Sequence, residues 1–166
     1  LNGTNLAIFS SIVHISSNPP LFGFMLRTNK KVRRDTFENI KENNIYTFNH
    51  IKPSFIENAH KTSIKFDKNL SEFETCNFTE YYISGFDVPF VKESEVKLGL
   101  RLKEIVVMKC TQSRFIVGEI EFCFVHKKYL NEDYSLNLEK SDTISVGGLN
   151  NYYESKKIIT LPYARL

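Results

Sequence analysis

The chain has 166 residues, enough for one domain with a hydrophobic core, and its 42% hydrophobic and 25% charged composition is that of an ordinary globular protein. A net charge of +3 is too small to predict a nucleic-acid partner, and no apolar run approaches the ~20 residues of a membrane-spanning helix. We therefore expect a single domain over residues 1–166 that binds neither nucleic acid nor a membrane.

Apolar and β-branched runs in the first fifty residues predict short strands. Because Asp35 and Glu38 have the spacing of a capping box, a helix is expected directly after them, with Phe37 and Ile40 toward the core. The predicted elements are strands at 6–9, 12–15, 21–26 and 45–49, and a helix at 36–43.

The rest of the chain predicts a helix at 55–63, because Ser54 and Glu57 form a second capping box, and one further helical turn at 71–74. Residues 76–95 show no period and suggest a long ordered loop. Strict apolar–polar alternation at 96–102 and at 116–124 then predicts a long antiparallel hairpin with a bulge near Glu104. A glycine-containing turn is expected at 145–149.

Mostly antiparallel strands with a few short helices indicate a mainly β fold, a closed or partly open barrel. The three cysteines, Cys76, Cys110 and Cys123, form no metal-binding pattern. Cys110 and Cys123 would lie roughly 26 Å apart along the hairpin at strand rise, too far for a disulfide. We expect buried free thiols and a reducing compartment, the cytoplasm.

A basic cluster joins the predicted strand at 21–26 to the predicted helix. Five of the eight residues 27–34 are Lys or Arg, among them Arg27 and Arg34, whereas the rest of the chain has 17 cationic and 19 acidic residues. Cationic side chains beside the free N–H groups of a helix start favour a phosphate, so a small anionic ligand is predicted. The plain alternative is a solvated basic loop.

Nucleotide-binding glycine motifs, serine hydrolase motifs and zinc motifs are absent from the sequence, and the four histidines have no metal-ligand spacing. Polar residues at the ends of apolar segments remain as candidates, with the alternative that they are turn and cap residues. They are Asn5, Ser10, Ser11, Asn49, His60, Thr62 and Ser63.

The order of several short motifs resembles the flavin reductase-like family of FMN-binding split β-barrels, in which an N-L-A-x-x-S-S element precedes an S-x-x-P-P corner. The motifs that carry this resemblance are at 5–11, 17–24, 34–40, 46–49, 58–63, 71–74, 89–94, 116–120 and 163–165. Two features depart from the family. The basic loop is richer in Lys than the Arg-Pro loop of close relatives, and the family's first strand is missing or shortened, so a strand is expected before the Asn2-Gly3 turn.

The resemblance implies a homodimer that binds FMN near the subunit interface. Asn5 and the backbone amides of Leu6, Ala7 and Ile8 would line the isoalloxazine, and Ser10 and Ser11 would contact the ribityl chain. Arg27, Arg34 and Thr36 would hold the phosphate. Asn49, His60, Thr62 and Ser63 correspond to positions near the ring or on its partner-facing side.

The function that follows is an NAD(P)H-dependent flavin reductase. It would take hydride from NADH or NADPH on bound FMN and pass electrons to free flavin, a partner oxygenase or a metal centre. One alternative is an FMN electron carrier without NAD(P)H activity. A further alternative is a flavin-free β-barrel binding module for nucleic acid or a small anion.

Overall fold

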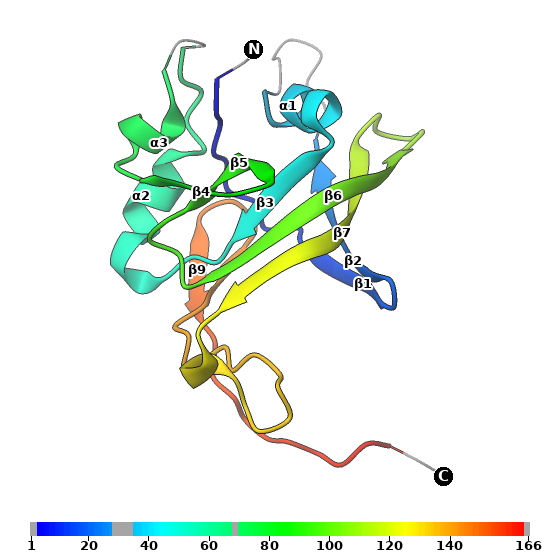
Figure 1. The fold of residues 1–166 in the computed structure, drawn as a ribbon, viewed down its shortest axis with the longest axis vertical. Coiled ribbons are helices and arrows are strands. Elements are labelled where there is room, and N and C mark those ends of the chain that lie inside the picture. The colour runs from blue at the N-terminus through cyan, green and yellow to red at the C-terminus, as the bar shows by residue number, and fades with distance from the viewer. Residues whose placement is uncertain (1–2, 28–34, 68–69, 165–166) are drawn as a thin grey trace.

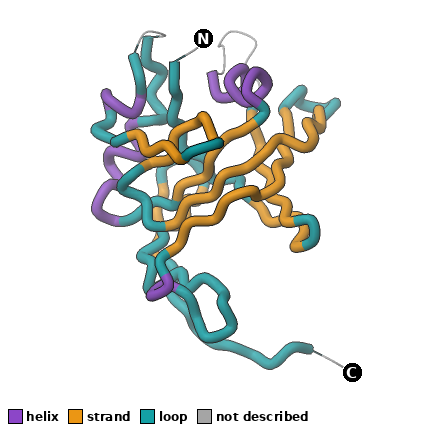
Figure 2. The backbone as a smooth tube through the Cα atoms, in the orientation of Figure 1, coloured by secondary structure: helices purple, strands orange, loops and turns teal. Residues whose placement is uncertain are grey.

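The computed structural model describes residues 3–27, 35–67 and 70–164. The fold is mainly antiparallel β with a few short helices, as predicted (Figures 1 and 2). The helices are α1 (Asp35–Asn43), α2 (Ile56–Lys61) and α3 (Glu72–Thr75), with single 3₁₀ turns η1 (Pro53–Phe55) and η2 (Lys127–Tyr129).

One five-stranded sheet forms the body of the molecule. Its strand order is β1-β2-β7-β6-β3, and every neighbouring pair is antiparallel. The strands are β1 (Val13–Ser17), β2 (Pro20–Leu26), β3 (Ile45–Asn49), β6 (Val96–Val107) and β7 (Arg114–Val125). Two further hairpins, β4 (Glu80–Ile83) with β5 (Phe86–Val91) and β8 (Ile144–Gly147) with β9 (Asn151–Glu154), lie outside this ladder.

The hairpin of β6 and β7 confirms the alternation in the sequence. Gln112 supplies the positive φ of 60° at its turn, and the register shifts between Leu102 and Glu104, where the bulge was predicted. A second shift between Gly99 and Leu100 was not predicted. Bulges increase local twist and bend a strand, so these two help the long strands to curl (Figure 1).

The strand β3 is the edge of the five-stranded ladder, and β5 lies beside it. Hydrogen bonds from side chains of β3, in place of a backbone ladder, connect β3 to β5. The Thr47 hydroxyl donates to the Pro89 carbonyl at 2.9 Å, and the Val91 N–H donates to Asn49 Oδ1 at 2.9 Å. The curled sheet is therefore only partly closed on this side.

Two hydrophobic clusters lie inside the fold. The first packs α1, through Ile40, against β2, β3, β6 and β7, and Phe37 is partly buried against it. Its buried members are Phe24, Leu26, Ile40, Tyr46, Phe48, Leu98, Leu100 and Ile116. The second cluster joins α2 and α3 to β5 and consists of Ala59, Phe73, Cys76, Phe78 and Val91.

Several predictions of local structure were wrong. Residues 6–9 do not form a strand, because no neighbouring strand pairs with them. Residues 76–95 are not a loop but contain β4 and β5; Pro89 obscured this strand in the sequence, and β5 tolerates it because its pairing partner is β4 alone. Ser54 does not cap a helix with its side chain, since it lies inside η1, which runs on into α2.

All three cysteines are free, as predicted, but only Cys76 is buried; Cys110 and Cys123 are exposed, contrary to the prediction. Cys110 lies in the turn of the β6–β7 hairpin, and Cys123 lies on the outward face of β7. No helix within the described ranges is long and apolar enough to cross a membrane.

Candidate functional site

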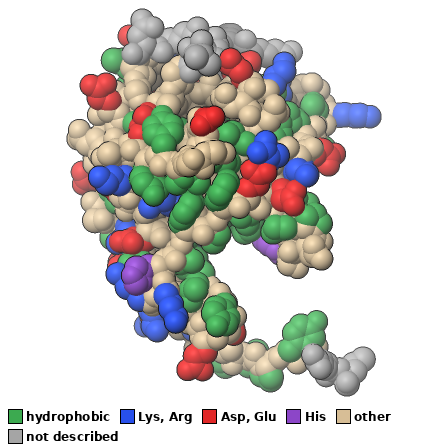
Figure 3. Space-filling view, in the orientation of Figure 1, with side chains coloured by type: hydrophobic (Ala, Val, Ile, Leu, Met, Phe, Trp, Pro, Cys, Tyr) green, Lys and Arg blue, Asp and Glu red, His purple; other side chains and the backbone are tan. Residues whose placement is uncertain are grey.

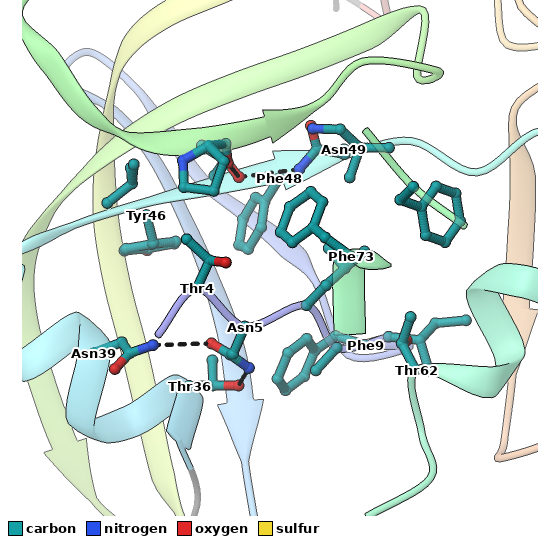
Figure 4. Close-up of a pocket in the computed structure, with 18 of the residues that line it drawn as sticks. Thr4, Asn5, Phe9, Thr36, Asn39, Tyr46, Phe48, Asn49, Thr62 and Phe73 are labelled. Carbon is teal, nitrogen blue, oxygen red and sulfur yellow. Dashed lines mark hydrogen bonds between the residues drawn. The ribbon is translucent and has the colours of Figure 1, made fainter. Parts of the chain in front are cut away.

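A cavity of about 470 Å³ lies between the N-terminal segment, β3, α1 and the second hydrophobic cluster (Figure 4). The N-terminal segment, residues 3–9, forms one wall. Aromatic side chains of both clusters, Phe24, Phe48 and Phe73, contribute apolar surface, and polar side chains gather at the end near α1. A cavity with mostly apolar walls and a few placed polar groups is typical of a small-molecule site.

The polar end is organised around the first turns of α1. Asn5 Nδ2 donates to Thr36 Oγ1 at 2.8 Å, and Asn39 Nδ2 donates to the Gly3 carbonyl at 3.1 Å and contacts Asn5 Oδ1 at 3.5 Å (Figure 4). Thr36 is the second residue of α1, where backbone N–H groups have no partner within the helix. The structure thus places Asn5 and Thr36 together at a helix start, which the sequence analysis proposed as a phosphate site.

The basic residues predicted for the phosphate are described only in part. Arg27 directly follows β2 and is exposed. Arg34 lies outside the described residues.

The N-terminal segment is anchored by one carboxylate. Glu72 of α3 accepts the Leu6 N–H at 3.3 Å, and burial raises the pKa of this carboxyl group. The Leu6 amide, predicted to contact a flavin, is therefore engaged with the protein. Ala7 and Ile8 also line the cavity, and their backbone N–H groups have no hydrogen-bond partner among the described residues.

Asn49 and Thr62 line the opposite part of the cavity but make structural hydrogen bonds. Asn49 Nδ2 donates to Thr47 Oγ1 at 3.0 Å, while its Oδ1 accepts from Val91. The buried Thr62 hydroxyl donates to the Ala59 carbonyl at 2.7 Å at the end of α2. Asn49 thus bonds a side chain and a distant backbone N–H group, and Thr62 bonds a local backbone carbonyl.

The remaining predicted residues lie outside the cavity lining. Ser11 Oγ bonds both the N–H and the carbonyl of Met25, at 3.1 and 3.3 Å, and so ties the segment to β2. Ser10 Oγ donates to the Gly148 carbonyl at 3.0 Å, and His60 Nδ1 lies 2.7 Å from Tyr152 Oη. Ser63 is exposed just beyond α2.

Sequence reasoning missed Asn39, Glu72 and Tyr152. Asn39 could have been found, because it follows Thr36 by three residues in the predicted helix and so shares its face. Glu72 and Tyr152 gave no such signal, since each bonds a residue that lies far away in the sequence, Leu6 and His60 respectively. The structure shows no cluster of three or more His, Cys, Asp or Glu that could hold a metal within the ranges it describes.

A curled, partly open antiparallel barrel, with a cavity that ends at a helix start, defines a split-barrel protein with a small-molecule site. The sequence model of the flavin reductase like domain matches residues 2–140, and the chain belongs to this family. This confirms the resemblance found in the sequence.

Solved structures confirm the split-barrel fold. A presumed flavin reductase with a split barrel domain from Shewanella frigidimarina NCIMB 400 is 40% identical, with a TM-score of 0.90 over 96% of this chain and 79% of that chain. Nitrilotriacetate monooxygenase component B from Bacillus cereus is 22% identical, with a TM-score of 0.82 over 93% of this chain and 78% of its own. Flavoredoxin of Desulfovibrio vulgaris (Miyazaki F) is 19% identical, with a TM-score of 0.81 over 96% and 82% of the two chains. No curated protein matches the chain.

Proposed function

We propose that this protein binds FMN and is an NAD(P)H-dependent flavin reductase. The observation that carries the proposal is the meeting of Asn5–Ile8 with Thr36 around one cavity with aromatic walls, where the backbone N–H groups of Ala7 and Ile8 have no partner among the described residues. Residue 5, residues 6–8 and residue 36 are the positions that the family resemblance assigns to the flavin. The 40% identity to the Shewanella protein supports the same function.

The residues present fit an FMN molecule. The cavity volume of about 470 Å³ is within the range of roughly 300–1,000 Å³ of ligand sites. Thr36, at the start of α1, would hold the phosphate together with Arg27 and Arg34, because a doubly charged anion is stabilised by cations and by free helix N–H groups. Since Leu6 is engaged with Glu72, Ala7 and Ile8 would supply the backbone donors to the polar edge of the ring.

FMN, when bound, would supply the redox chemistry, which is hydride uptake from NADH or NADPH and electron transfer to free flavin or to a partner such as an oxygenase. The chain itself would orient the ring between the N-terminal segment and the aromatic side chains that line the cavity. Backbone donors beside the ring favour the negative charge that a flavin gains on reduction and so raise its potential.

We further propose that the protein acts as a homodimer in the cytoplasm. Residues 155–164 extend away from the body of the molecule (Figures 1 and 3). The side chains of Ile158 and Leu161 on this arm are 93% and 72% exposed. Covering such apolar side chains is favourable by roughly 25 cal/mol per Å² buried, which supports a second copy of the chain as the partner.

Stopped-flow mixing of FMN-loaded protein with NADH, and separately with NADPH, tests the reductase assignment. We expect at least one of the two nicotinamides, NADH or NADPH, to bleach the flavin absorbance. Bound flavin that is reduced by dithionite but by neither nicotinamide would contradict the reductase and leave an electron carrier. Protein that binds no FMN would contradict both and favour a flavin-free module.

A further inference from the structure

One histidine, His50, lines the cavity. It directly follows the last residue of β3, whereas α1 ends just before the first residue of this strand. The cavity therefore meets α1 and His50 at opposite ends of β3. Near His50, the polar side-chain atoms of Asn49 and Thr62 are already engaged in hydrogen bonds within the protein.

Three hydrogen bonds in series join the imidazole of His50 to a backbone carbonyl. His50 Nδ1 lies 3.1 Å from Thr143 Oγ1, which lies 2.8 Å from Ser141 Oγ. Ser141 Oγ in turn donates to the Leu138 carbonyl at 3.2 Å. A carbonyl oxygen only accepts, and a hydroxyl group has a single proton to donate.

The direction of the last bond determines the direction of the other two. Since Ser141 gives its proton to the carbonyl, Thr143 donates to Ser141. The proton of Thr143 is then used, so His50 Nδ1 donates to Thr143. The series of bonds therefore places a proton of His50 on Nδ1.

The other ring nitrogen of His50, Nε2, has a lone pair to offer. Burial lowers the pKa of His50, so the ring is neutral at pH 7 and holds one proton only. Nε2 has no hydrogen-bond partner among the described residues, and the side-chain polar atom that is enclosed there without a partner is Tyr46 Oη. Nε2 is therefore not enclosed. Thr143, which faces Nδ1, does not line the cavity, so the opposite side of the ring is the side turned to it.

The N-terminal segment reaches the same part of the cavity. Ile8 and Ile51, the residue after His50, both pack against the second hydrophobic cluster. The backbone N–H groups of Ala7 and Ile8 have no partner among the described residues. This part of the cavity thus combines backbone donors from one segment with an imidazole acceptor from another.

We propose that His50 Nε2 accepts a hydrogen bond from a ring N–H group of the ligand, which in FMN is the N3–H of the isoalloxazine. The inference rests on the proposed FMN binding. The polar edge of this ring has N3–H between two carbonyl oxygens, so an acceptor with backbone donors near it is complementary to that edge. His50 would thereby determine which way round the ring enters the cavity.

The first experiment uses the wild-type chain. ¹⁵N NMR at pH 8 without flavin measures the tautomer of His50, whose signals are identified by their loss in His50→Gln, and we expect the Nδ1–H form. The affinities for FMN and for N3-methyl-FMN are then compared. We expect the methylated flavin to bind about tenfold more weakly, because it has no proton at N3 and leaves Nε2 unpaired.

The second experiment compares His50→Gln with His50→Met. Both side chains have similar length and lack the imidazole, but only Gln carries a strong acceptor, its amide oxygen, since the Met sulfur accepts weakly. We expect His50→Gln to keep most of the preference for FMN over N3-methyl-FMN and His50→Met to lose it. A merely structural contact of the imidazole would be lost in both variants alike.

The outcomes separate the inference from the proposed function. An equal preference in His50→Gln and His50→Met, with FMN still bound, would overturn the inference and leave the function standing. No FMN binding by the wild type would remove both. If the variants do not fold, the wild type alone decides: His50 in the Nε2–H form, or equal affinity for the two flavins, would overturn the role of His50.

Discussion

Gly118 on β7 and the side chain of Tyr46 on β3 pack closely against each other in the core. A Cβ atom at Gly118 would lie 2.2 Å from Tyr46 Oη and 2.8 Å from the ring carbon that bears it. The Tyr46 side chain is buried, and its hydroxyl has no hydrogen-bond partner among the described residues. Burial also raises the pKa of this hydroxyl far above its ordinary value. The Tyr46 ring can therefore pack beside β7 only because residue 118 is a glycine.

Gly118→Ala is expected to lower the free energy of unfolding by about 1–3 kcal/mol, the usual cost of overpacking a core. Urea unfolding at equilibrium measures it. Gly3→Ala is the matched control, because a Cβ there has no heavy atom within 4 Å, and it should leave the stability unchanged. Tyr46→Phe should be close to neutral, because it removes a hydroxyl that is buried without a partner, and it should recover part of the loss at Gly118. Full stability of Gly118→Ala would contradict the packing described for these two residues.

At the scale of elements, the sequence predicted those parts of the fold whose residue pattern is local. The β6–β7 hairpin, α1 and the β8–β9 turn follow from alternation, an Asp/Glu start and a glycine turn. The N-terminal segment could not be predicted in the same way. Its composition is that of a strand, but Leu6 bonds the distant Glu72 in place of a neighbouring strand.

The candidate site could also be predicted only where its pattern is local in the sequence. The pattern around Asn5 and Thr36 was visible in the sequence, and the structure joins these residues by a hydrogen bond. The bonds of His60 to Tyr152 and of Ser10 to Gly148 span 92 and 138 residues, so no local pattern could contain them.

His50, directly after β3, links this strand to the segment before β8. Its Nδ1 lies 3.1 Å from Thr143 Oγ1, and its carbonyl accepts from Ser94 Oγ at 2.9 Å. Burial lowers the pKa of His50. The ordinary histidine pKa is about 6.5. As pH falls below this value, His50 of the unfolded chain therefore binds a proton, whereas His50 of the folded chain stays neutral to a lower pH. The stability that depends on neutral His50 is present above this pH and is lost below it.

We expect His50→Gln to reduce the loss of unfolding free energy between pH 7.5 and pH 5.5. Urea unfolding at the two pH values measures the difference. His14→Gln is the control for the substitution itself, because His14 is an exposed histidine on β1. Equal pH dependence of His50→Gln and wild type would contradict the assignment.

For the whole molecule, the central feature is the cavity between two hydrophobic clusters. The first cluster belongs to the curled sheet and α1, and the second to α2, α3 and β5. The N-terminal segment covers the space between them and is held by Glu72 and Thr36, and Ser11, two residues beyond the segment, is bonded to Met25. The fold thus provides walls made by packing and a polar end made by α1, which is the arrangement that a ligand with an aromatic ring and an anionic tail requires.

Titration of FMN into the full chain, followed by flavin fluorescence, tests this account most directly when the wild type, Thr36→Val and Thr111→Val are compared. Thr111 is exposed in the turn of the β6–β7 hairpin and does not line the cavity. We predict saturable binding by the wild type and by Thr111→Val, and an affinity for Thr36→Val that is weaker by about 1.5–3 kcal/mol, the value of a hydrogen bond to a charged group. Equal affinity of all three proteins for FMN, or binding by none, would contradict a flavin site at the start of α1.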